Sequence, residues 1–208
     1  MWLPRFYPIL DTEVAIHHGF DPVMAAEEIL DAGAQILQFR HKGFLSREVF
    51  GQMERIAALC REARVPFVVN DRADLAALLG ATLHLGQDDL PPTAARRVTG
   101  PETLIGYSTH NQRQLQAAQS QPADYLALGP IFATRSKQNP DPSVGLDELR
   151  RLRPLTERPL VAIGGITRDN ARDVLAAGAN SLAVIGDLFP HTGNLRARAQ
   201  DWLRVTTF

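Results

Sequence analysis

The chain has 208 residues, of which 45% are hydrophobic and 22% are charged, a composition typical of a globular protein. Lys and Arg number 22 and Asp and Glu 23, so the formal net charge of -1 predicts no nucleic-acid partner and no anionic membrane surface. No run of about 18 apolar residues occurs, and the first ten residues lack the pattern of a secretory signal, so we expect no membrane partner. Because the single cysteine, Cys60, excludes an internal disulfide and a cysteine-built zinc site, we expect a reducing, cytoplasmic location.

Short apolar runs alternate along the chain with longer segments of helical periodicity. The runs predicted as strands are Phe6–Leu10, Gln35–Phe39, Pro66–Val69, Thr82–Leu85, Thr103–Tyr107, Tyr125–Leu128, Leu160–Ile163 and Ser181–Ile185. Several are apolar on successive residues, as parallel strands covered by helices are. Among the helical segments, Pro22–Asp31 follows Asp21, a favoured N-cap residue, and Asn170–Ala177 precedes Gly178, a favoured residue after a helix end.

This alternation predicts an α/β fold. Eight strands in a chain of this length leave roughly 26 residues for each strand–helix pair, which is close to the minimum for a parallel connection. A doubly wound open sheet is the alternative, but it requires a glycine-rich loop after its first strand, and residues 11–14 contain no glycine. We therefore predict a single-domain (β/α)8 TIM barrel with parallel strands over residues 1–208.

In such barrels the functional groups lie at the C-terminal ends of the strands. Polar residues or glycines follow seven of the eight predicted strands, at Gln38–Lys42, Asn70–Arg72, Gly86–Asp89, Ser108–His110, Thr134–Lys137, Gly164–Gly165 and Gly186–Asp187. Because these ends meet at one mouth of the barrel, we expect a single site there.

Two carboxylates and three cations stand out within this set. Asp71 and Asp89 follow neighbouring strands and could share Mg²⁺, which takes one or two protein carboxylates together with water and phosphate oxygens. Each could instead cap the helix that follows it. Arg40, Lys42 and Lys137 could cradle a diphosphate opposite them, although ordinary surface pairing is the alternative for each.

The remaining strand ends suggest a second phosphate site and an acid–base group. Gly164–Gly165 and Gly186 leave backbone N–H groups uncrowded where barrel enzymes often hold phosphate, although glycines there could simply permit tight turns. His110 could act as an acid or base. His84 lies in an apolar run and is interpreted as a satisfied core residue. Two phosphate sites and no nucleophilic side chain favour a displacement in which diphosphate leaves and a second substrate attacks.

Seven short motifs occur in a fixed order: Gln38-x-Arg40-x-Lys42, Asn70-Asp71-Arg72, His84-Leu85-Gly86-Gln87-Asp88-Asp89, Ser108-Thr109-His110, Gly129-Pro130-Ile131-Phe132, Thr134-Arg135-Ser136-Lys137 and Ile163-Gly164-Gly165-Ile166. With them the chain resembles the thiamine phosphate synthase family from about Tyr7 to Ile185. The resemblance implies a transferase that joins 4-amino-2-methyl-5-hydroxymethylpyrimidine diphosphate to a thiazole phosphate, giving thiamine phosphate and diphosphate. It implies a dissociative substitution, in which diphosphate departs before the thiazole nitrogen attacks.

The resemblance also implies roles for individual residues. One Mg²⁺ per subunit would be held by Asp71 and Asp89. The groups expected to act in catalysis are Arg40, Lys42, Ser108 and Lys137. The substrate-binding set would be Gln38, Phe39, Arg40, His41, Lys42, Asn70, Ser108, Thr134, Arg135, Ser136, Lys137, Gly165, Ile185 and Gly186. Within it, Gln38 and Ser108 would contact the pyrimidine. The residues that would bind the thiazole phosphate are Thr134, Arg135, Ser136, Gly165, Ile185 and Gly186. A homodimer is the expected assembly.

Three positions depart from the family pattern. His41 stands where the family usually has Glu, Ser136 replaces a Thr, and Gly186-Asp187 replaces Ser-Ala. Asp187 either faces the phosphate and weakens its binding, or points into the following turn. Two other functions stay open on the same barrel: a thiazole tautomerase that uses His110, and a non-catalytic regulator of the thiamine pathway. The acidic pair and the cations favour the synthase.

Overall fold

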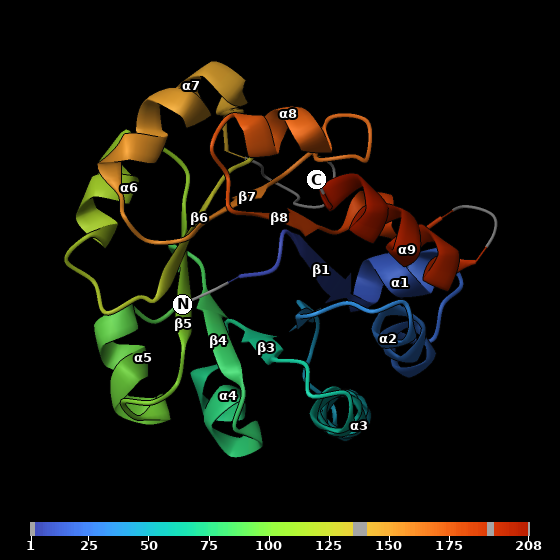
Figure 1. The fold of residues 1–208 in the computed structure, drawn as a ribbon. Coiled ribbons are helices and arrows are strands. Elements are labelled where there is room, and N and C mark those ends of the chain that lie inside the picture. Colours follow the sequence, from blue (N-terminus) through green and yellow to red (C-terminus); the bar gives the residue numbers. More distant parts are fainter. Residues whose placement is uncertain (1–2, 135–140, 191–193, 208) are drawn as a thin grey trace.

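The computed structural model describes residues 3–134, 141–190 and 194–207. In these residues eight parallel strands form a closed barrel in which each strand pairs with the next and β8 pairs with β1 (Figure 1). The strands are β1 Phe6–Asp11, β2 Leu37–Arg40, β3 Phe67–Asn70, β4 Thr82–Leu85, β5 Ile105–Thr109, β6 Tyr125–Leu128, β7 Leu160–Ile163 and β8 Ser181–Val184. The predicted TIM barrel is confirmed.

Helices cover the outside of the barrel (Figure 1). They are α1 Thr12–His17, α2 Pro22–Asp31, α3 Arg47–Glu62, α4 Ala73–Leu79, α5 Pro92–Thr99, α6 Gln112–Ala118, α7 Gly145–Leu152, α8 Ala171–Ala176 and α9 Leu195–Thr206, with 3-10 turns at Arg153–Leu155 and Gly186–Leu188. Asp21 caps α2 by accepting hydrogen bonds from the backbone N–H groups of Val23 and Met24. Among the described helices, none is long and apolar enough to cross a membrane.

Three strands begin later than the sequence predicts. The hydrogen-bonded ladder between β2 and β3 begins at Leu37 and Phe67, because Pro66 has no N–H to donate. β5 begins at Ile105, two residues after the predicted start. β2 and β3 also end one residue later than predicted, at Arg40 and Asn70, so the sheet itself holds these two backbones at the mouth of the barrel.

Two apolar layers hold this scaffold together. The larger lies between the sheet and the helices and contains the buried thiol of Cys60, whose pKa burial raises to about 12. There the ring of Phe6 stacks on that of Trp202 at 5.6 Å and so ties α9 to β1. The smaller layer fills the inside of the barrel and includes Tyr7 and Tyr125.

Candidate active site

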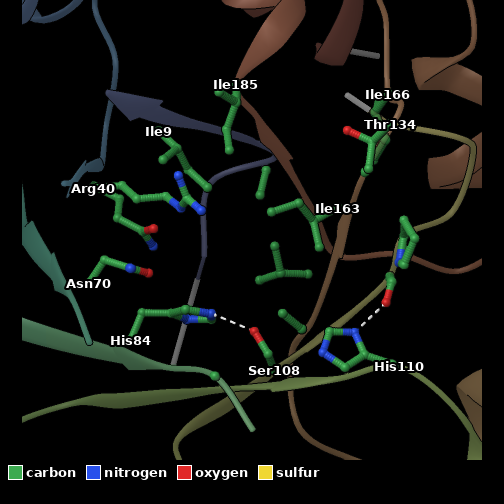
Figure 2. A pocket seen from close by; sticks show the side chains of 18 of the residues that line it. Ile9, Arg40, Asn70, His84, Ser108, His110, Thr134, Ile163, Ile166 and Ile185 are labelled. Carbon is green, nitrogen blue, oxygen red and sulfur yellow. Dashed lines mark hydrogen bonds between the residues drawn. The ribbon is translucent and has the colours of Figure 1, made fainter. Parts of the chain in front are cut away.

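A cavity of about 560 Å³ opens at the C-terminal ends of the strands. Figure 2 shows Arg40, Asn70 and His84 on one side of it and Thr134 and Ile163 on the other. The charged side chains Arg40, Lys42, Asp71, Asp88 and Asp89 come from the ends of β2, β3 and β4 and the loops after them. The opposite side, after β6, β7 and β8, combines glycines and isoleucines with Thr134, Asp141, Thr167 and Asp187. The expected convergence of strand ends on one site is therefore what the structure shows.

Arg40 and Lys42 are predicted to bind a diphosphate, and both line the cavity and pair with carboxylates. Arg40 forms an ion pair with Asp11, the residue beside it in the β1–β2 ladder, and Asp11 is buried. Lys42 Nζ lies 2.5 Å from Asp71 Oδ2. A bound anion would therefore approach cations that already have counter-charges, so we expect the gain in Coulomb energy to be smaller than for unpaired cations.

The two carboxylates predicted to hold a metal are neighbours. Asp71 has a φ of 66°, a left-handed conformation uncommon outside glycine, and its N–H donates to the His84 carbonyl at 2.8 Å. Asp89 Oδ2 accepts a hydrogen bond from Gly86 N at 2.7 Å. Burial and the hydrogen bond with Asp71 raise the pKa of the Asp89 carboxyl.

The alternative role of these carboxylates as helix caps is wrong. The residues at the N-cap positions of α4 and α5 are Arg72 and Pro91, and neither helix has a side-chain cap. The side chain of Asp89 closes the turn after β4 instead, and Asp71 pairs with Lys42.

The donor set fits Mg²⁺. Two adjacent carboxylates supply hard oxygen ligands. The raised pKa of Asp89 indicates that its carboxyl group retains a proton more readily than usual, and a bound Mg²⁺ would take the place of that proton. In the part of the chain that the structure describes, no group of three or more His, Cys, Asp or Glu side chains is placed to hold a metal ion. A site with only two carboxylates leaves coordination positions for water and phosphate oxygens, as Mg²⁺ requires.

A buried chain of hydrogen bonds runs beneath the polar side of the cavity. Gln38 Nε2 donates to the Tyr7 hydroxyl at 2.9 Å, which lies 2.9 Å from the Tyr125 hydroxyl. His84 Nδ1 lies 3.1 Å from the Tyr125 hydroxyl, and its Nε2 lies 2.9 Å from Ser108 Oγ, the bond drawn in Figure 2. Burial lowers the pKa of His84 to about 4 and raises that of Tyr7 to about 12, so both are neutral near pH 7. His84 is thus buried and satisfied by hydrogen bonds, as predicted, but it also lines the cavity.

On the opposite side of the cavity, backbone conformation and close packing require glycine at two positions. Gly164 and Gly165 have φ values of 95° and 64°. A Cβ on Gly165 would lie 2.6 Å from the Ala133 carbonyl oxygen, and one on Gly164 would lie 2.4 Å from Pro130 Cβ. The segment after β6 therefore packs directly on these two residues, and the close approach as well as the backbone conformation requires glycine.

Asp187 is paired with arginines. Its Oδ2 accepts hydrogen bonds from Arg168 Nε at 3.0 Å and from the Arg168 backbone N–H at 3.3 Å, and its Oδ1 lies 3.5 Å from Arg198 Nη1. Although Asp187 lines the cavity, two guanidinium groups compensate its charge. The hypothesis that it repels a bound phosphate loses its physical basis.

His110 also lines the cavity, at the end of β5. Its Nδ1 lies 2.6 Å from the Gly129 carbonyl oxygen, to which it donates, and 3.7 Å from Asp141 Oδ2 (Figure 2 draws the first of these contacts). The bond to Gly129 fixes the orientation of the ring.

The structure brings most of the predicted residues to the cavity. Those that line it are Gln38, Arg40, Lys42, Asn70, Asp71, Asp89, Ser108, Thr134, Gly165, Ile185 and Gly186. Arg135, Ser136 and Lys137 lie outside the described residues.

Two predicted substrate-binding side chains need correction. Phe39 is buried in the core between the sheet and the helices, because successive residues of a strand point to opposite faces and Gln38 and Arg40 occupy the inner one. The side chain of His41 lies outside the lining of the cavity: its Nδ1 lies 2.7 Å from Thr12 Oγ1, and its Nε2 lies 3.2 Å from a loop carbonyl.

Sequence reasoning missed three residues that support the site: Tyr7, Asp11 and Tyr125. The alternation of β1 could have indicated the first two, because Tyr7, Ile9 and Asp11 share one face of that strand. Tyr125 gives no such signal in a strand that is apolar throughout.

Comparisons with known proteins agree on one family. A family model described as thiamine monophosphate synthase matches residues 6–188. A thiamine-phosphate synthase of Koribacter versatilis is 49% identical over 210 residues, which cover 98% of this chain and 96% of the relative. One of Chlorobium phaeovibrioides is 44% identical over 82% of each chain. The solved structure of thiamine phosphate pyrophosphorylase from Pyrococcus furiosus superposes with a TM-score of 0.85 at 30% identity, covering 97% of this chain and 95% of that one.

Proposed function

Since this chain belongs to the thiamine monophosphate synthase family, we propose that it joins 4-amino-2-methyl-5-hydroxymethylpyrimidine diphosphate to a thiazole phosphate, releasing diphosphate and forming thiamine phosphate. The observation that carries the proposal is the division of one cavity between charged side chains and glycine backbone. The first arrangement suits a metal-bound diphosphate, and the second suits a phosphate bound by N–H groups.

We assign the leaving diphosphate to the side of β2, β3 and β4. Arg40, Lys42 and Asn70 would bind its oxygens, together with Lys137, which follows β6 in the sequence. Asp71 and Asp89 would hold one Mg²⁺ per subunit. When bound, the cation neutralises negative charge that develops on the diphosphate as its bond to the pyrimidine methylene breaks. The ion pairs of Arg40 and Lys42 keep these side chains in place before substrate arrives.

We assign the thiazole phosphate to the side of β7 and β8. Backbone N–H groups at Gly165 and Gly186 and the hydroxyls of Thr134 and Ser136 would bind its phosphate, with Arg135 adding charge. Ile185 would contact the thiazole ring. In this arrangement the protein holds the thiazole nitrogen against the methylene carbon of the pyrimidine, so that orientation supplies much of the rate enhancement.

The choice between this function and its alternatives depends on the carboxylates. A thiazole tautomerase acting through His110 makes no use of the Asp71–Asp89 pair, and a non-catalytic regulator makes no use of a metal site. The proximity of the two carboxylates and the Lys42 ion pair support the synthase. Cytoplasmic location and a homodimer belong to the proposal as well, and fractionation and light scattering test them.

The test is synthesis from the two substrates. We expect the purified chain to form thiamine phosphate and diphosphate in equal amounts when Mg²⁺ is present, and neither when the metal is chelated. Asp71→Asn should abolish this turnover, whereas the matched variant Asp173→Asn, on the exposed surface of α8, should retain it. Tautomerisation of a thiazole phosphate with no product from the pyrimidine would show the alternative enzyme instead.

A further inference from the structure

The buried hydrogen-bond chain begins and ends at residues that line the cavity. Gln38 stands at one end and Ser108 at the other, and both line it. The three residues between them are Tyr7, Tyr125 and His84, and all three are buried, although Tyr7 and His84 also contribute to the lining. The direction of the hydrogen bonds among these three residues therefore decides whether Gln38 and Ser108 present a donor or an acceptor to a ligand.

The protons of this chain have one consistent direction. Because the Tyr7 oxygen accepts from Gln38 Nε2, its own proton goes to the Tyr125 oxygen. The proton of Tyr125 then goes to His84 Nδ1. This leaves the imidazole proton on Nε2, which donates to Ser108 Oγ. The Ser108 hydroxyl proton is consequently left to donate into the cavity.

Other protonation patterns leave a proton without an acceptor. If Tyr125 donated to Tyr7, the Tyr7 proton would have no acceptor among the described residues, and Tyr7 is only 1% exposed although it lines the cavity. An imidazolium at His84 would have the same effect, since it would donate to Tyr125 and turn the Tyr125 proton toward Tyr7. A buried donor without a partner is destabilising.

The middle of the chain is held rigidly. The ring of Tyr125 stacks against that of His84 at a centroid distance of 5.6 Å. Gly106 pairs with Tyr125 across the β5–β6 ladder, and a Cβ there would lie 2.1 Å from Tyr125 Cζ. A glycine at this position thus makes room for the tyrosine ring, and the hydroxyl keeps its place between Tyr7 and His84.

The two ends present a donor and an acceptor to a ligand. Gln38 turns its Nε2 toward Tyr7, which leaves its Oε1 as the acceptor, and Ser108 offers its hydroxyl proton. A 4-aminopyrimidine matches this pair, because its amine donates and the adjacent ring nitrogen accepts. The 4-oxo counterpart has a carbonyl and a ring N–H at the same positions, so its pattern is reversed.

We propose that Tyr7, Tyr125 and His84 are positioning residues that fix the hydrogen-bond direction at Gln38 and Ser108, so that the cavity selects an aminopyrimidine over an oxopyrimidine. The proposal rests on the proposed function for the identity of the ring. The direction of the buried chain itself does not depend on catalysis.

The first experiment measures the tautomer of His84 by ¹⁵N NMR in the wild-type, metal-free protein, with His84→Gln to assign the signal. We expect Nε2 to carry the proton and Nδ1 to be unprotonated. A proton on Nδ1 would reverse the chain and overturn the proposal. Because this measurement needs no substrate, its result is independent of whether thiamine phosphate is formed.

The second experiment compares binding of 4-amino-2-methyl-5-hydroxymethylpyrimidine diphosphate and its 4-oxo analogue by calorimetry with Mg²⁺. We expect the wild type to prefer the amino compound by about 100-fold, because the analogue mispairs both ends of the chain. Tyr125→Phe and Tyr7→Phe should each reduce the preference to about tenfold or less while leaving thiazole phosphate affinity unchanged. Tyr107→Phe, in the same strand as Ser108 but packed against the outer core, is the matched control and should keep the full preference.

The outcomes separate the two proposals. Absence of thiamine phosphate synthesis together with the expected tautomer and binding preference would refute the proposed function and leave the selection mechanism standing. An unchanged preference in both tyrosine variants, or equal binding of the two rings by the wild type, would overturn the selection mechanism even if synthesis proceeds.

Discussion

The side of the cavity formed by β2, β3 and β4 presents charged side chains, whereas the side formed by β7 and β8 presents mainly glycines and isoleucines, together with Thr167 and the arginine-paired Asp187. On the first side, Arg40 and Lys42 pair with Asp11 and Asp71, so the groups that would meet a ligand are held by partners of opposite charge. On the second, backbone conformation and close packing create the surface. We therefore expect phosphate binding on the two sides to respond differently to substitution, to pH and to metal removal.

The largest effect should come from the carboxylates. Asp89→Asn removes one of the two charged oxygen ligands, while its amide oxygen can still accept from Gly86 N, so we expect a folded protein. Turnover at saturating Mg²⁺ should fall at least about 100-fold, because metal neutralisation of a leaving diphosphate is worth several kcal/mol. Steady-state kinetics with Asp173→Asn as the control measures this, and wild-type rates in Asp89→Asn would remove the metal site from the account.

Gly165→Ala probes the backbone side. The new Cβ meets the Ala133 carbonyl at 2.6 Å in a residue whose φ is 64°, so we expect the free energy of unfolding to fall by about 3 kcal/mol. Gly80 has a φ of 62° but nothing within 4 Å, and Gly80→Ala should cost only about 1–2 kcal/mol. Denaturant unfolding compares the two. Equal losses would mean that conformation alone, and not the close approach, requires glycine at position 165.

Arg40→Ala should weaken diphosphate binding more than thiazole phosphate binding. The substitution removes charge-assisted hydrogen bonds worth about 1.5–3 kcal/mol, which corresponds to about 10- to 100-fold in affinity, and leaves the buried carboxylate of Asp11 unpaired. Calorimetry of each ligand measures the difference. If both affinities fell equally, the variant would have disturbed the whole mouth of the barrel instead of one side.

Mg²⁺ binding on the charged side of the cavity should also depend on pH. Burial and Asp71 raise the pKa of Asp89, so a proton competes with Mg²⁺ at a higher pH than for an ordinary carboxyl. As the pH falls through that raised value, Mg²⁺ affinity should decrease by at most about tenfold per pH unit. Metal titrations at pH 7 and pH 5 test this. A pH dependence that persists unchanged in Asp89→Asn would assign it to another group.

The smallest effect is expected at Asp187. Arg168 and Arg198 compensate its carboxylate at 3.0 and 3.5 Å, so removing the charge changes the field at the cavity little. We expect Asp187→Asn to alter the KM for thiazole phosphate by less than about twofold. A clear decrease in that KM would restore the interpretation that this acid faces the phosphate.

Local pattern was sufficient to predict much of the fold and less of the site. Thr82–Leu85, Tyr125–Leu128 and Leu160–Ile163 are strands with the predicted bounds, because clear turn residues or changes of pattern flank each apolar run. The motifs also located the cavity-lining residues at strand ends. Strand starts at positions 37, 67 and 105 depend on the register between strands, which one run of sequence does not contain.

The residues that sequence reasoning missed depend on contacts between distant segments. Arg40 meets Asp11 only because the β1–β2 ladder sets them side by side, and Tyr7 meets Tyr125 only inside the closed barrel. Phe39 shows the converse error: it lies within a motif, yet the alternation of its strand turns it into the core. Motif membership indicates which strand ends matter, and side-chain direction decides which residues reach the ligand.

The difference between the two sides can be measured directly with two ligands and one metal. Isothermal titration of inorganic diphosphate and of thiazole phosphate, each with and without Mg²⁺, isolates each side without any chemical step. We expect diphosphate affinity to require Mg²⁺ and to be lost in Asp89→Asn, while thiazole phosphate binds equally well in all four combinations of protein and metal. Metal-independent binding of diphosphate, or a metal requirement for thiazole phosphate, would contradict the division of the cavity into a charged side and a backbone side.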